Sequence, residues 1–194
     1  GIQLGHSGRK GATKKPWEGN GPMETPWNLI SASPISFNDN FATPKEMTLE
    51  DMAEIKAQFV QAAKNADEAG FDMIELQTHH GFLLASFLSP LTNIRTDEFG
   101  GSIENRLKYP LEVFNSIREV FPAEKPISVR ISATDWTENG ISEQEVITIA
   151  TAFKNAGADI INVSTGNTVA GQKPLTGRMW QTPFSDAVRN TVHI

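Results

Sequence analysis

The sequence predicts an α/β protein built as a TIM barrel, a (β/α)8 fold, of which the chain holds an interior part. Short apolar strands alternate with amphipathic helices, which indicates a parallel sheet with helices packed on its faces. Polar residues follow the strands while the helix-to-strand connections are tight, as in barrels whose sites lie at the carboxyl ends of the strands. A doubly wound sheet is the alternative, but no strand leads into a G-x-G-x-x-G phosphate turn.

Four strands can be placed from apolar runs and alternation. They lie within Gly1–Gly8 and at Phe71–Leu76, Ile127–Ser132 and Ala158–Ser164. A complete barrel needs eight strands and typically about 250 residues. We therefore expect the 194 residues to form one partial domain, 1–194, that covers roughly the third to sixth βα units. The unpaired sheet edges of such a wedge argue against a stable isolated domain.

Helix starts are marked by two capping boxes, Thr48 with Asp51 and Ser142 with Glu145. Gly70 follows the first of these helices, where a residue in the left-handed conformation is expected. Apolar residues at helical spacing indicate further helices at Phe82–Leu88, about Glu104–Val120 and Thr182–Thr191.

Composition restricts the classes of function. The chain is 39% hydrophobic and 21% charged, which is ordinary for a globular protein. It has no cysteine, so disulfides, thiolate nucleophiles and Cys-ligated metals are excluded. A net charge of −6 predicts no binding to nucleic acid or to an anionic membrane, and no apolar run is long enough to span a bilayer. We expect a cytoplasmic protein whose partner is a small-molecule substrate.

Polar side chains from four strand ends should converge on one mouth of the barrel. They are Gln3, His6, Gln77, His80, Arg130, Ser164 and Thr165. Carboxylates are sparse among them, and two histidines are weak evidence for zinc, so no metal is expected. An amide beside an arginine suits a flat, hydrogen-bonding ring such as a flavin pyrimidine. The Gly- and Pro-rich stretch 9–43 is long for a loop, which predicts an active-site excursion.

The chain contains three distinctive runs: QLGHSGRK, HGFLLASFLSPLTNIRTDEFGGSIENR and SVRISATDW. In these runs it closely resembles the Old Yellow Enzyme family of FMN-dependent NAD(P)H:flavin oxidoreductases. Within that family it is most similar to the reductase half of salicylyl-CoA or anthraniloyl-CoA hydroxylase/reductase fusions, in GHSGRKGATKKPWEG and VSTGNTV…GRMWQTPFSDAVRN. The resemblance implies an FMN cofactor with NAD(P)H as reductant, and hydride transfer from flavin N5 to an enone-like or aryl-CoA-derived substrate. For the full-length protein it leaves open a homo-oligomer or a fusion to a hydroxylase domain.

The resemblance also implies roles for individual residues. Gln3 matches the glutamine that hydrogen-bonds the flavin pyrimidine, and Arg130 matches the arginine near flavin N1 and O2. The pair that binds the substrate oxygen reads Gln77 and His80, with Gln77 in place of the usual histidine. The family's FMN phosphate site lies on the last two βα units, outside the units expected here.

Proton donation is where the sequence departs from the family. Phe82 stands where a tyrosine usually protonates the substrate carbon opposite the hydride, and a phenyl ring has no proton to give. His79 is a candidate substitute. Strand alternation predicts, however, that His79 and His80 point to different sides. Two alternatives therefore stay open: a flavin-dependent amine or alcohol dehydrogenase of the same barrel family, and a flavin-binding domain with decayed catalysis.

Overall fold

The structure, a computed structural model, describes residues 1–19, 21–24 and 26–194. Its main sheet consists of β1 (Ile2–Leu4), β4 (Ile74–Thr78), β5 (Ile127–Ser132) and β6 (Ile160–Ser164). These strands are parallel and lie in the order β1-β4-β5-β6. The predicted strands are thus confirmed, although β4 covers 74–78 rather than 71–76.

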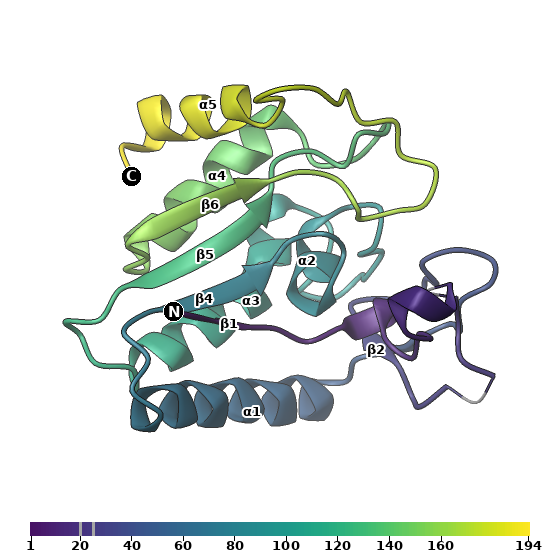
Figure 1. Cartoon of the computed structure of the whole chain (residues 1–194), viewed down its shortest axis with the longest axis horizontal. Coiled ribbons are helices and arrows are strands. Elements are labelled where there is room, and N and C mark those ends of the chain that lie inside the picture. The colour runs from purple at the N-terminus through teal and green to yellow at the C-terminus, as the bar shows by residue number, and fades with distance from the viewer. Residues whose placement is uncertain (20, 25) are drawn as a thin grey trace.

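The helices lie behind the sheet and along its two edges, and its front face stays open (Figure 1). They are α1 (Leu49–Glu68), α2 (Leu83–Leu88), α3 (Ile103–Arg118), α4 (Glu143–Asn155) and α5 (Thr182–Val192). Both predicted capping boxes are present, before α1 and before α4. Gly70 has a φ of 80°, so it takes the left-handed conformation expected after α1. Among the described residues, no helix combines the length and apolar character needed to cross a membrane.

The segment between β1 and α1 lies beyond the carboxyl ends of the strands (Figure 1). It contains two short 3-10 helices, η1 (Gly8–Lys10) and η2 (Pro16–Glu18), and a two-stranded parallel sheet of β2 (Ile30–Ser31) and β3 (Lys45–Glu46). The sequence did not predict β2 and β3, because strands of two residues are too short to show a period. The position of this segment at the carboxyl ends of the strands agrees with the predicted active-site excursion.

The two faces of the sheet differ in chemistry. The face toward the helices carries fully buried side chains: Ile74, Leu76, Ile127, Val129 and Ile131. They pack with helical aromatic residues, such as Phe59, Phe114 and Phe153, into one core. The alternate positions of these strands point away from the helices and, apart from Ile160 at the start of β6, are polar: Gln3, Glu75, Gln77, Ser128, Arg130 and Asn162. In a closed barrel this second face turns inward, and ligands bind where it ends, at the carboxyl ends of the strands.

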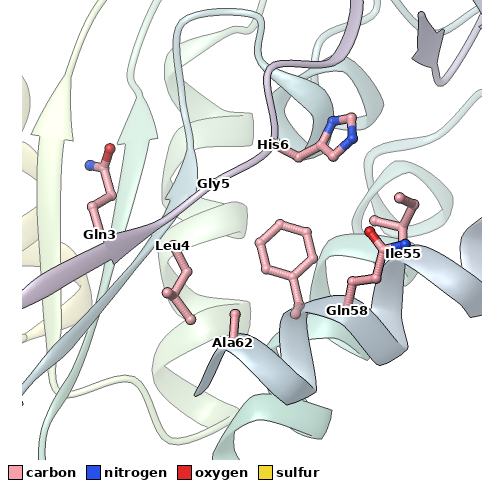
Figure 2. Close-up of a pocket in the computed structure, with 8 residues that line it drawn as sticks. Gln3, Leu4, Gly5, His6, Ile55, Gln58 and Ala62 are labelled. Carbon is pink, nitrogen blue, oxygen red and sulfur yellow. The ribbon is translucent and has the colours of Figure 1, made fainter. Parts of the chain in front are cut away.

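Figure 2 shows this division at β1, where Leu4 points toward Ala62 of α1 and Gln3 points to the opposite side. A groove of about 310 Å³ lies between β1 and α1, with Leu4, Phe59 and Ala62 in its wall. It lies on the helix side of the strand. Its lining also includes Gln3 at the edge of the sheet, but neither Gln77 nor Arg130.

Candidate active site

The parallel register aligns polar side chains in layers on the open face. Gln77 of β4 lies beside Arg130 of β5, and Arg130 lies beside Asn162 of β6. Gly5, directly after β1, continues this layer, because a Cβ at that position would collide with the side chain of Gln77. Glycine at this position therefore makes room for the Gln77 amide.

Gln3, Gln77 and Glu75 form a hydrogen-bonded chain across β1 and β4. Gln77 Nε2 donates to Gln3 Oε1 at 3.0 Å, and Gln3 Nε2 donates to Glu75 Oε1 at 2.7 Å. The other oxygen of Glu75 accepts from Ser128 Oγ at 3.0 Å and from Asn162 Nδ2 at 2.8 Å. Because a carboxylate only accepts, Glu75 fixes which end of the Gln3 amide faces Gln77.

Sequence reasoning missed Glu75, which was read only as part of a buried strand. The available signal was its spacing of two from Gln77, which places both side chains on one face of the strand. We expect Glu75→Ala to lower the free energy of unfolding by about 1–3 kcal/mol, because buried Ser128 and the two amides lose their acceptor. Urea unfolding followed by circular dichroism measures this. Glu68→Ala, at an exposed position of α1, is the control, and an equal effect of both changes would contradict the role of Glu75.

Arg130 has unused donor capacity on the polar face. Its Nε is buried without a partner among the described residues, and Nη2 makes only a 3.5 Å contact with Ser164 Oγ. A buried donor without an acceptor is costly, so this guanidinium suits a ligand that presents acceptor atoms. The pyrimidine edge of FMN presents carbonyl oxygens and ring nitrogens. The donor set of Arg130 and the neighbouring amides therefore fits this group.

The two histidines follow β4 in a tight turn. β4 ends at Thr78, and His80 has a φ of 57°, a left-handed conformation that is uncommon outside glycine. The turn brings the two imidazoles side by side, with ring centroids 4.0 Å apart. The prediction that His79 and His80 point to different sides is therefore wrong, because alternation holds only within the strand.

His80 is held against the carboxyl ends of β5 and β6. Its backbone N–H donates to Ser132 Oγ at 2.9 Å, and its Nε2 lies 2.7 Å from Ser164 Oγ. Burial, assisted by the charges of Arg130 and Lys10, lowers the pKa of His80 to about 4. The ring is therefore neutral at pH 7, and it can donate a hydrogen bond without carrying a charge.

His79 is buried, with 3% of its surface exposed, and its Nδ1 lacks a partner among the described residues. Burial and the nearby groups His80, Arg130 and Lys10 lower its pKa to about 3. Its ring meets Phe82 edge-on, with centroids 5.8 Å apart. A neutral imidazole is a poor proton donor at pH 7, so the electrostatics disfavour His79 as the substitute acid.

The other residues expected at the mouth have structural partners. His6 Nδ1 accepts from the backbone N–H of Gly8 at 3.0 Å, which closes the turn after β1. Thr165 Oγ1 accepts from Gln181 Nε2 at 3.2 Å. The chain's single tyrosine, Tyr109, is fully buried, and its hydroxyl group donates to a carbonyl of α1. This hydroxyl group is therefore engaged in the core and is not one of the polar groups at the mouth. Within the described ranges, no group of three or more His, Asp or Glu residues is arranged to hold a metal.

Residues 1–191 match the family described as NADH:flavin oxidoreductase / NADH oxidase. The chain belongs to this family. The expected cofactors, FMN with NAD(P)H as reductant, are those of the family, and the resemblance to Old Yellow Enzymes is confirmed at this level. The likeness to hydroxylase fusions is a finer statement that this match does not address.

Individual relatives agree with the family match. The NADPH dehydrogenase of Clostridium acetobutylicum is 40% identical over 194 residues, which are 100% of this chain and 53% of that protein. The chain thus spans about half the length of the curated relatives it matches.

Two solved structures are similar over nearly the whole chain. Histamine dehydrogenase from Rhizobium sp. 4-9 has a TM-score of 0.80 and 28% identity, over 99% of this chain and 27% of that one. A 2-naphthoyl-CoA reductase in complex with 2-naphthoyl-CoA has a TM-score of 0.78 and 26% identity, over 96% and 30% of the two chains. The predicted TIM-barrel fold is confirmed, with this chain as part of a barrel.

Proposed function

We propose that residues 1–194 form one partial FMN-binding barrel domain of an NAD(P)H oxidoreductase of the ene-reductase type. The acceptor is an enone-like or aryl-CoA-derived small molecule. The observation that carries this proposal is the placement of Gln77, His80 and Arg130 at one end of the open sheet face. The buried Nε of Arg130 also lacks an acceptor among the described residues. The family match and the NADPH dehydrogenase relatives support it.

The residues of the chain divide into two groups in this reaction. Gln3 and Arg130 would hold the pyrimidine ring of FMN, which when bound supplies hydride transfer from NAD(P)H. Gln77 Nε2 and the N–H of His80 donate to the acceptor's carbonyl oxygen and stabilise the negative charge that develops there. His80 exchanges its contact with Ser164 for this oxygen, and Gln77 exchanges its contact with Gln3.

The aryl-CoA form of the acceptor is the finer part of the proposal. It is supported by the sequence resemblance to salicylyl-CoA and anthraniloyl-CoA fusion reductases, and by the structural likeness to a 2-naphthoyl-CoA reductase. A fusion to a hydroxylase domain, a homo-oligomer and a cytoplasmic location stay predictions for the full-length protein.

A second candidate is an amine dehydrogenase, favoured by the likeness to histamine dehydrogenase. The two half-reactions of the FMN-loaded protein distinguish the candidates. Reduction of the flavin by NAD(P)H and rapid reoxidation by cyclohexenone or an aryl-CoA support the first. Reduction by amines supports the second. Tight FMN binding without either reaction supports a domain with decayed catalysis.

Phe82→Tyr tests whether proton delivery limits the proposed reaction. A phenol at the N-terminus of α2 lies beside the histidine pair and can donate, so if delivery of the proton limits reoxidation by an enone, that step should become roughly tenfold faster or more. Flavin reduction by NAD(P)H should stay nearly constant, because no proton is transferred to carbon in that step. Stopped-flow absorbance follows both steps. Phe41→Tyr, whose ring contacts Phe37, is the control, and an unchanged Phe82→Tyr rate would show that another group already donates.

A further inference from the structure

The ammonium of Lys10 lies directly beside the turn that carries the histidine pair. Lys10 ends η1, and its Nζ donates to the carbonyl oxygens of His80 at 3.0 Å and Asn167 at 2.9 Å. The same nitrogen lies 4.6 Å from the ring centroid of Phe37 and 4.9 Å from that of Phe82. The side chain is therefore fixed by two carbonyls and two aromatic rings, next to the residue proposed to bind the acceptor oxygen.

An ammonium has three N–H groups, and two of those on Lys10 are engaged by carbonyls. The aromatic rings of Phe37 and Phe82 stabilise the charge by cation–π attraction, which does not use a hydrogen-bond donor. Lys10 Nζ thus lies over the face of Phe82 and beside the turn that carries His80, with one N–H not used by these two carbonyls.

The other titratable groups around this turn are His79, His80, Arg9 and Asp135. His79 and His80, which face Lys10 across the turn, have pKa values lowered by burial to about 3 and about 4 and carry no transferable proton at pH 7. Arg9, beside Lys10 in η1, is buried and donates to backbone carbonyls, and its pKa is lowered by burial only to about 10. Asp135, which acts electrostatically on Arg9, is fully buried and accepts from Ser89.

Lys10 differs from these groups in its acidity. Burial, and then repulsion from Arg9, lowers its pKa to about 8. It keeps its proton at pH 7 and yet is a stronger acid than a free lysine, whose pKa is about 10.4. A general acid is most effective when its pKa lies near the working pH.

We propose that Lys10 is the proton donor of this site, where position 82 carries only a phenyl ring. This inference rests on the proposed function. FMN, reduced by NAD(P)H, would supply a hydride to one carbon of the acceptor's C=C bond. The π electron pair then forms a C–H bond at the neighbouring carbon with a proton of Lys10 Nζ, the N–H bond breaks, and its electrons remain on a neutral amine. Solvent returns the proton to the amine.

Lys10→Met and Lys10→Arg in the FMN-loaded protein test the assignment. Both should slow reoxidation by cyclohexenone on the order of 100-fold, while reduction by NADPH stays within about twofold. Arginine keeps the charge and can reach the same carbonyls, but its pKa of about 12.5 or more makes it a poor acid. Lys10→Arg therefore separates proton donation from a purely electrostatic or structural role. Lys14→Met, at an exposed position after the same turn, is the control and should leave both steps unchanged.

A second acid at position 82 should rescue the loss. In Lys10→Met combined with Phe82→Tyr, reoxidation should recover by roughly tenfold or more, because the phenol supplies the proton. The pH profile should move with the donor. In the wild type, reoxidation should fall as the pH rises through about 8, where Lys10 loses its proton. In the double variant the fall should move toward the ordinary tyrosine pKa of about 10.

A measurement that does not depend on turnover is the NMR titration of lysines labelled by reductive ¹³C-methylation in the same protein. The Lys10 signal, assigned by its absence in Lys10→Arg, should titrate near pH 8, well below the value of about 10.4 for a free lysine. Unchanged reoxidation in both variants, full activity of Lys10→Arg, or a Lys10 signal that titrates like a free lysine overturns the Lys10 assignment and leaves the proposed function in place. A wild-type protein whose flavin is not reduced by NAD(P)H, or is not reoxidised by any enone or aryl-CoA, overturns both.

Discussion

His80→Ala is expected to slow reoxidation of the flavin by an enone about 10²- to 10³-fold, which is the usual effect of losing one oxyanion-hole donor. The imidazole is neutral and positioned in advance, with Ser132 holding its backbone and Ser164 its Nε2. An alanine provides no donor, and the oxygen's developing charge then faces only Gln77. Reduction of the flavin by NADPH should change little, because that step does not use the carbonyl site.

Stopped-flow measurement of both half-reactions checks this expectation. Binding of a substituted phenol, followed by flavin absorbance, provides a readout without turnover and should weaken in parallel. His193→Ala, at an exposed position after α5, is the matched control. Equal slowing of both half-reactions would instead place the effect on flavin binding, and an unchanged reoxidation rate would remove His80 from the site.

Arg106→Met is expected to lower the free energy of unfolding by about 3–5 kcal/mol, the range for breaking a buried ion pair on one side. Arg106 is 3% exposed and donates to the carbonyl oxygens of Leu88 and Gly101 and to the carboxylate of Glu145. The substitution leaves two carbonyls without this donor, and it leaves Glu145 without its counter-charge at the start of α4. The hydrogen bond from α3 to α2 and the ion pair from α3 to α4 are lost together.

Urea unfolding measures the effect, with Arg178→Met at an exposed position as the control, expected to stay within about 0.5 kcal/mol of wild type. Adding Glu145→Gln to Arg106→Met should recover part of the stability, because the double variant no longer holds an unpaired carboxylate. A loss below about 1 kcal/mol for Arg106→Met would show that Glu145 is solvated well enough to need no partner.

Much of the fold could be predicted because its signals are local. The capping boxes need residues only three positions apart, so Thr48 with Asp51 and Ser142 with Glu145 could be recognised in the sequence and are present in the structure. The strand ends that deliver Gln77 and Arg130 were predicted for the same reason, and the register places the two side chains in one layer. Their roles toward FMN and acceptor stay predictions.

The sequence alone was enough to establish the family and the order of strands and helices, because these depend on motifs and on spacing along the chain. The arrangement of the site, in contrast, depends on contacts between residues that are far apart in the sequence. Glu75 bonds to Asn162 across 87 positions, and Lys10 reaches His80 across 70. The left-handed backbone of His80, which sets the two imidazoles side by side, follows from the turn that joins β4 to α2. No periodicity encodes such contacts, because they arise only when distant strand ends meet at one edge of the sheet.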